Sequence, residues 1–135
     1  MNSNWQELNA LALAYIGDAV YELWVRRHLL DAGCIRVQAM HKRAVGYVRA
    51  SAQARILHTL LPGLDGEEQQ VVLRGRNSKG SYPRNVDVVT YRHATAFEAL
   101  VGFWYLRGRQ DRIDWAFGQI DVLLAENTME TGDGR

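Results

Sequence analysis

The sequence predicts an all-α fold, and three observations support that prediction. Apolar residues recur at spacings of three and four along most of the chain, which is the period of a helix. Proline, which interrupts helices, occurs only at Pro62 and Pro83. Glycine and short polar runs separate the periodic stretches. A chain of 135 residues with 47% hydrophobic composition is long enough for one domain with its own core.

Three helices are expected in the first half of the chain, over residues 10–30, 37–48 and 50–61. The first carries a broad apolar stripe that includes Leu13, Ile16, Val20, Leu23 and Leu30. Asn9 is a candidate N-cap, and Asn4 with Glu7 has the spacing of a capping box. Gly33 is the expected left-handed residue after the first helix.

Three further helices are expected over residues 65–74, 91–106 and 109–126. Glu67 and Glu68 lie in the first turn of the fourth helix, where the helix dipole favours negative charge. The glycine-rich, basic stretch 75–85 is predicted to be an exposed loop. Residues 127–135 have almost nothing to bury, so we expect a single domain over 1–126 followed by a flexible tail.

The net charge of +1 conceals an uneven distribution. Residues 34–93 hold ten bases and four acids, whereas both flanking segments are acidic. The basic middle is a candidate polyanion-binding surface or a solvated positive face. A single cysteine, Cys34, and the lack of a signal-peptide pattern or an uninterrupted apolar span predict a cytoplasmic protein without a membrane segment.

Asp18 and Glu98 are carboxylates in the middle of apolar helical stretches. They are either surface acids or acids turned inward, and buried carboxylates are rare unless paired or bound to metal. Two of them on different helices could converge on a hard cation such as Mg²⁺. Gly17 and Gly102 lie beside them, and a helix-interior glycine costs about 1 kcal/mol relative to alanine. Such glycines suggest close approach between the two helices.

Residues 15–20 (YIGDAV) and 97–102 (FEALVG) resemble the two acidic motifs of the ribonuclease III family, in the same order and with similar separation. With the Arg-Gly-Arg-Asn stretch at 74–77, residues 8–126 are similar to the short Mini-ribonuclease III branch, which has a catalytic domain alone. The resemblance implies a ribonuclease III-type helical endonuclease domain. Larger family members carry further acids at the positions of Ala14 and Thr95. The resemblance implies that the short branch lacks these acids too and works with two carboxylates. Thr95 could hold a metal-bound water or hydrogen-bond back to its own helix.

The resemblance implies a bacterial homodimer that cleaves double-stranded RNA with Mg²⁺ held by Asp18 and Glu98, leaving 5′-phosphate ends and short 3′ overhangs. The implied substrate is the base-paired ends of large-subunit (23S) ribosomal RNA precursor, with a ribosomal protein as a conceivable partner on it. The residues expected to contact RNA are Arg74, Arg76, Asn77, Lys79, Arg84 and Arg92. Ser78 and Ser81 could add hydrogen bonds, and Gly75 and Gly80 could let the backbone approach the RNA. The basic group of His41, Lys42, Arg43 and Arg49 is a weaker patch, expected to be a solvated helix face.

Several other residues have a structural explanation from the sequence. Glu22 is expected to pair with Arg26 one turn later rather than to support Asp18. The aromatic residues Trp24, Phe103, Trp104 and Trp115 are expected in the core or a dimer interface. His93 and Cys34 receive no role. Two rival functions remain open: a non-catalytic ribonuclease III-fold RNA-binding or ribosome-associated module, and an unrelated helical metal hydrolase acting on nucleotides.

Overall fold

The computed structural model describes residues 9–78 and 82–124, and all regular secondary structure within them is helical. This confirms the all-α prediction. The elements are α1 (Ala10–Asp31), α2 (Val37–Val48), α3 (Ala50–Leu60), a 3₁₀ turn (Leu61–Gly63), α4 (Gly66–Arg76), α5 (Val88–Leu106) and α6 (Gln110–Phe117). A further helical turn covers residues 120–124. Across the described parts of the chain, no helix is long and apolar enough to span a bilayer.

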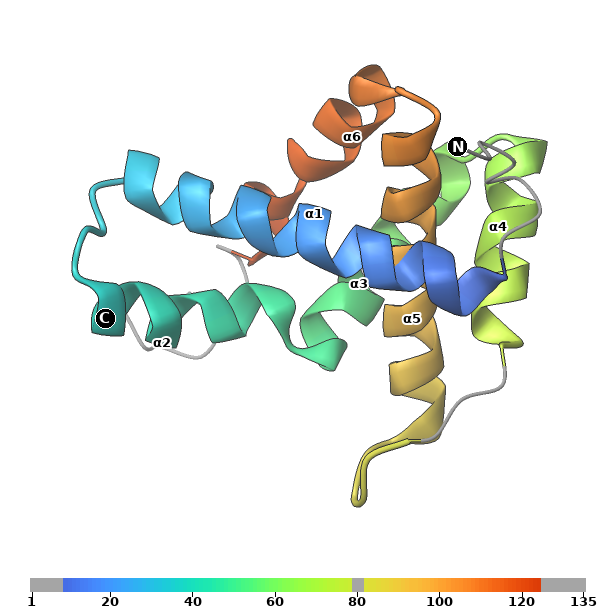
Figure 1. Cartoon of the computed structure of the whole chain (residues 1–135), viewed down its shortest axis with the longest axis horizontal. Helices are drawn as coiled ribbons and strands as arrows, with labels where there is room; N and C mark the ends of the chain where they lie inside the picture. Colours follow the sequence, from blue (N-terminus) through green and yellow to red (C-terminus); the bar gives the residue numbers. More distant parts are fainter. Residues whose placement is uncertain (1–8, 79–81, 125–135) are drawn as a thin grey trace.

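Helix α5 is the centre of the fold, and α1, α3 and α4 pack around it (Figure 1). Most of its residues between 94 and 104 are buried on every side, including Phe97, Leu100 and Trp104. A helix that is apolar all round is expected at the middle of a bundle. Phe103 and Trp104 are buried, and Trp24 and Trp115 pack against the core, which confirms their interpretation as core aromatics.

Helices α1 and α5 cross with their backbones in contact, as the glycines predicted. A Cβ atom placed on Gly17 would lie 1.7 Å from the carbonyl oxygen of Glu98. A Cβ atom on Gly102 would lie 2.0 Å from the carbonyl oxygen of Leu13. No side chain fits at either position, so the two glycines set the separation of the helices that carry Asp18 and Glu98.

Caps explain where α1 begins and ends and where α5 begins. The side chain of Asn9 accepts a hydrogen bond of 2.8 Å from the Ala12 N–H, and Gly33 has the expected positive φ of 96°. Helix α5 begins at Val88, three residues earlier than predicted, because the side chain of Asp87 accepts from the Val89 N–H. The upstream cap at Asn4 and Glu7 and the predicted tail at 127–135 lie outside the described residues.

Two helix ends differ from the sequence predictions. Helix α4 continues through Gly75 to Arg76, so the exposed loop starts later than expected. The predicted last helix, 109–126, is interrupted by a turn at residues 118–119, after α6 has ended at Phe117.

Glu68 is a buried charged residue, whereas the sequence predicted only a favourable interaction of its charge with the helix dipole. Its side chain is 2% exposed and accepts two hydrogen bonds of 2.7 Å from the guanidinium of Arg112. It also accepts one of 2.8 Å from the indole N–H of Trp104 and one from the backbone N–H of Asp65, the N-cap of α4. Glu68 therefore joins α4, α5 and α6, and the Arg112 guanidinium and these donors hold its pKa below the usual range despite burial.

Candidate active site

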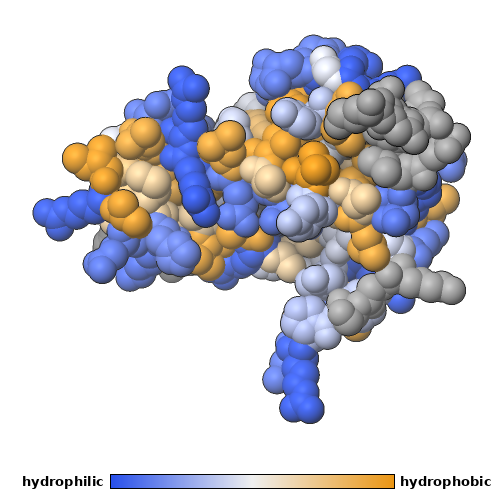
Figure 2. All heavy atoms as spheres, in the orientation of Figure 1, coloured by the Kyte–Doolittle hydropathy of each residue, from blue (hydrophilic) through white to orange (hydrophobic). Residues whose placement is uncertain are grey.

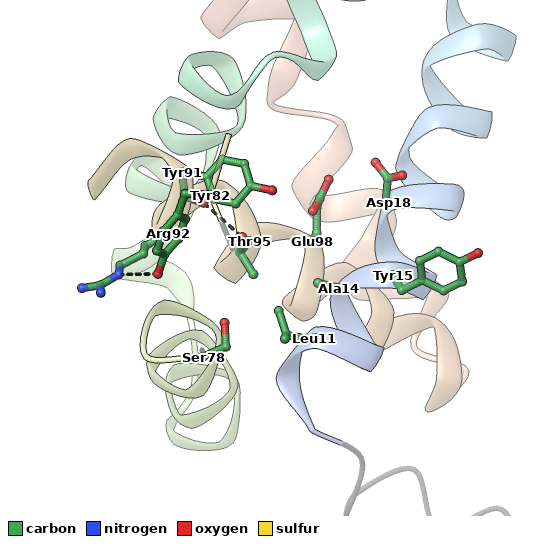
Figure 3. A pocket seen from close by; sticks show the side chains of 10 residues that line it. All are labelled: Leu11, Ala14, Tyr15, Asp18, Ser78, Tyr82, Tyr91, Arg92, Thr95 and Glu98. Atoms are coloured by element: carbon green, nitrogen blue, oxygen red, sulfur yellow. Dashed lines mark hydrogen bonds between the residues drawn. The ribbon is translucent and has the colours of Figure 1, made fainter. Parts of the chain in front are cut away.

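A cavity of about 360 Å³ opens where the first half of α1 meets the first half of α5 and the end of α4 (Figure 3). It is lined by Leu11, Ala14, Tyr15, Asp18, Ser78, Tyr82, Tyr91, Arg92, Thr95 and Glu98. Both predicted carboxylates and one predicted RNA-contacting arginine are therefore in one hollow. The helices that supply the carboxylates are those locked together by Gly17 and Gly102.

Asp18 and Glu98 are electrostatic neighbours at the crossing of α1 and α5. Figure 3 shows their carboxyl groups pointing to the same side from the two helices, and both residues are half-buried. Burial, a hydrogen bond with Asp18 and the negative charge of Asp18 raise the pKa of Glu98 to about 8. Without a cation Glu98 therefore holds its proton near neutral pH, because a second negative charge beside Asp18 is unfavourable. The structure thus favours the inward-turned reading over two unrelated surface acids.

The donor set suits a hard divalent cation that keeps most of its water. Mg²⁺ is commonly bound by one or two carboxylates, with water completing the octahedron. Within the described residues, no group of three or more acidic, histidine or cysteine side chains could enclose a metal. Ala14 is a small residue in the cavity lining. The Thr95 hydroxyl donates to the Tyr91 carbonyl at 3.1 Å, which is the hydrogen bond to its own helix that the sequence offered as one alternative.

A basic and aromatic wall borders the acidic pair. The Nε–H of Arg92 donates to the Tyr82 hydroxyl at 3.0 Å, and its guanidinium lies 5.8 Å from the centre of the Tyr82 ring. Tyr82 also packs edge-on against Tyr91, with ring centres 5.5 Å apart. Arg92 was expected to contact RNA, and it lies near the start of α5, which begins at Val88. The two tyrosines were not singled out from the sequence, because neither belongs to a motif.

The other predicted RNA-contacting residues lie around the cavity or beside it. Arg74 and Asn77 line an adjoining groove between the end of α4 and the start of α1. Arg76 and Arg84 are exposed and line neither hollow, and Lys79 lies outside the described residues. The segment from residue 82 to α5 projects from the helical body, and its surface is strongly hydrophilic (Figures 1 and 2).

Gly75 does not bring the backbone close to RNA, which corrects the sequence prediction. It is buried within α4, and a Cβ atom there would lie 2.7 Å from the Cα atom of Ala96. Its role is close packing of α4 on α5. The Ser78 hydroxyl donates to the Gly75 carbonyl at 2.9 Å while lining the cavity. Gly80 and Ser81, the other loop residues of that prediction, lie outside the described residues.

Gln53 is a neighbour of Glu98 that the sequence prediction missed. It is 3% exposed on α3, and its amide N–H donates to the Val48 carbonyl at 2.8 Å. A hydrogen bond from Gln53 opposes the rise in the pKa of Glu98. The signal in the sequence was a polar residue in line with the apolar positions of that helix, namely Ile56, Leu57 and Leu60.

The residues that received structural explanations behave largely as expected. Glu22 pairs with Arg26 at 3.4 Å on the exposed side of α1, and its charge adds modestly to the raised pKa of Glu98. His93 is half-buried and is absent from the described lining of the cavity. Cys34 is a buried free thiol. The basic group His41, Lys42, Arg43 and Arg49 is exposed on and after α2.

Comparison with known proteins gives concordant matches. The ribonuclease III domain family matches residues 11–109. A Mini-ribonuclease 3 of Desulfitobacterium hafniense is 56% identical over 134 residues, which is 99% of this chain and 85% of that protein. A Mini-ribonuclease 3 of Brevibacillus brevis is 53% identical over 106 residues, covering 78% of this chain and 79% of that protein.

A solved structure has the same architecture. The crystal structure of a Fusobacterium nucleatum protein superposes with a TM-score of 0.79 at 30% sequence identity. The match covers 87% of this chain and 96% of that protein.

Proposed function

The chain belongs to the ribonuclease III domain family and to its Mini-ribonuclease 3 group, and from that membership we propose a metal-dependent endonuclease for double-stranded RNA. One observation carries the proposal beyond family membership. The carboxyl groups of Asp18 and Glu98, 80 positions apart in the sequence, meet in a cavity bordered by Arg92. The proposed catalytic unit is residues 1–126.

Asp18 and Glu98 are the proposed ligands of Mg²⁺. When bound, the ion supplies positive charge to the scissile phosphate and lowers the pKa of the attacking water. Ionised Glu98 is required for that binding, since a protonated carboxyl group is a poor ligand. Arg92, which donates to Tyr82 at the edge of the cavity, is proposed to bind a backbone phosphate of the same duplex. Attack of water on phosphorus with cleavage of the P–O3′ bond would leave a 5′-phosphate on one product and a 3′-hydroxyl on the other.

The RNA grip is proposed to extend outward from the cavity. Double-stranded RNA is bound mainly through phosphates, 2′-hydroxyls and shape. Arg74 and Asn77 in the adjoining groove and the exposed Arg76 and Arg84 could neutralise or hydrogen-bond successive phosphates. Lys79 is included in the proposal from the sequence alone.

A second copy of the chain is the proposed partner. The first helix and the following loop expose large apolar side chains, among them Tyr15 at 80%, Leu23 at 70% and Ile35 at 73%. Figure 2 shows apolar surface along α1 between hydrophilic side chains. Apolar patches of this kind commonly mark protein interfaces. A homodimer would provide two acidic sites, one for each RNA strand.

The finer assignment is maturation of the base-paired ends of 23S ribosomal RNA precursor in the bacterial cytoplasm. It is supported by the family resemblance and by the bacterial Mini-ribonuclease 3 relatives. Precursor end mapping in cells lacking the protein tests it. Digestion of purified precursor with and without bound ribosomal proteins tests the need for such a partner.

Cleavage of long duplex RNA with and without Mg²⁺, followed by end mapping, tests the central proposal. Asp18→Asn and Glu98→Gln should each abolish cleavage and keep RNA binding. Binding without cleavage by the wild type would instead establish the non-catalytic module. Membership of the ribonuclease III domain family argues against the second rival, an unrelated helical metal hydrolase acting on nucleotides. A nucleoside triphosphate serves as the negative control substrate.

A further inference from the structure

Gln53 and Glu68 are the two buried polar or charged side chains of the described residues. Glu68 is fully explained by its hydrogen bonds to Arg112 and Trp104. Gln53 has one side-chain atom, Oε1, that is buried and has no hydrogen-bond partner in the described structure. Its burial among apolar residues therefore needs a separate explanation.

The orientation of the Gln53 amide is fixed by its surroundings. The Val48 carbonyl at the end of α2 can only accept, so the amide nitrogen must face it at 2.8 Å. An amide nitrogen carries two hydrogens, so the second remains for Glu98, whose pKa the Gln53 side chain lowers as a hydrogen-bonding neighbour. One planar group on α3 thus links the end of α2 to a carboxylate on α5.

Capping of α2 explains only part of this arrangement. An exposed polar side chain could cap the Val48 carbonyl without burying an unpaired oxygen, which costs about 1–3 kcal/mol. The oxygen belongs to the same planar amide and therefore lies near Glu98, although Gln53 itself does not line the cavity. A buried acceptor beside an acidic pair suits a donor that enters the site, such as a water molecule of a hydrated cation.

We propose that Gln53 is a positioning residue for the acidic pair. Its second N–H holds the carboxylate of Glu98 in the direction that meets Asp18, and its free oxygen is reserved for a water molecule bound in the site. This inference rests on the proposed function, because it assigns Gln53 to the same cation site. Partners of ligating groups typically change metal affinity or activity by about 10- to 100-fold when removed.

Gln53→Met tests the proposal, since methionine has a similar length and cannot form these hydrogen bonds. Gln69→Met is the control, because Gln69 also donates to a carbonyl five residues earlier, at 3.1 Å, and is not among the groups that act on Glu98. Mg²⁺ binding is measured by calorimetry on the RNA-free full chain. Cleavage kinetics are measured at saturating Mg²⁺, and circular dichroism checks folding.

The expected result for Gln53→Met is Mg²⁺ binding weakened about 10-fold or more and a lowered kcat, with the KM for RNA unchanged. Gln69→Met should match the wild type in all three quantities. A folded Gln53→Met protein with wild-type Mg²⁺ affinity and kcat would overturn the role of Gln53 and leave the endonuclease intact. A wild type that neither binds Mg²⁺ nor cleaves duplex RNA would overturn both. If Gln53→Met does not fold, Gln53→Asn, which keeps the amide but draws it back from Glu98, decides by the same comparison.

Discussion

Replacing Glu98 with glutamine should change how the stability of the metal-free protein depends on pH. In the folded wild type, burial and Asp18 raise the pKa of Glu98 from 4.5 to about 8. The folded chain therefore holds a proton that the unfolded chain releases in that interval. The contribution of Glu98 to the free energy of unfolding is therefore greatest below pH 4.5, falls as the pH rises and levels off above pH 8. Glutamine does not ionise, so this contribution is absent from Glu98→Gln.

The size of the effect follows from the pKa change. Each pKa unit corresponds to about 1.4 kcal/mol, so the wild type loses at most about 4 kcal/mol between pH 5 and pH 8 through this group. Urea denaturation of both proteins in EDTA, at several pH values, measures the difference in the free energy of unfolding. Other titrating groups are common to both proteins and largely cancel in the difference.

Excess Mg²⁺ provides the second half of the experiment. At pH 8 it should stabilise the wild type, because ligand binding to the folded state adds to its stability, and it should stabilise Glu98→Gln much less. Stability curves that remain parallel from pH 5 to pH 8 in EDTA would refute the reasoning, since they would mean that Glu98 ionises without hindrance in the folded protein.

Three further predictions concern packing, the buried ion pair and RNA binding. Gly102→Ala should lower the free energy of unfolding in urea by about 3 kcal/mol or more, because the added Cβ atom would collide with the backbone of α1. Gly46→Ala on α2 is the control: its Cβ atom enters open space and should not destabilise the protein. Equal effects of the two substitutions would contradict the crossing geometry. Glu68→Gln should cost about 3 kcal/mol in the same assay by leaving Arg112 without its counter-charge, and a loss under 1 kcal/mol would argue against the buried pair. In a cleavage-inactive Asp18→Asn background, Arg92→Ala should weaken duplex RNA binding and reduce the slope of log affinity against log salt concentration by about 1. Arg27→Ala on α1 is the control and should leave affinity and slope unchanged. An unchanged slope for Arg92→Ala would mean that Arg92 does not contact a phosphate.

The sequence predicted the parts of this structure that depend on local pattern. Helical periodicity located α1 and α2 to within a residue, and Gly17 and Gly102 indicated the backbone contact before it was seen. The meeting of Asp18 and Glu98 was also expected. Glycines and carboxylates in the middle of an apolar helix would be unfavourable if the helix were isolated. Their presence therefore indicates tertiary packing.

The parts that were missed depend on partners distant in the chain. Glu68 looked like an ordinary first-turn acid, because its partner Arg112 is 44 positions away. Gln53 and Tyr82 belong to no motif and gain meaning only from neighbours on other elements. Gly75 was misread for the same reason, since its contact with Ala96 was invisible in the sequence.

The contact between Gly17 and the carbonyl of Glu98 has a consequence for how the molecule melts. The same residue supplies both the packing surface of α5 and one of the two carboxylates, so the helices cannot separate without separating the acidic pair. Loss of the cation site and loss of tertiary structure should therefore occur in one cooperative transition on heating. Amide protons at the α1–α5 crossing should exchange only through global unfolding, which makes the reacting groups part of the slowest-exchanging region of the protein.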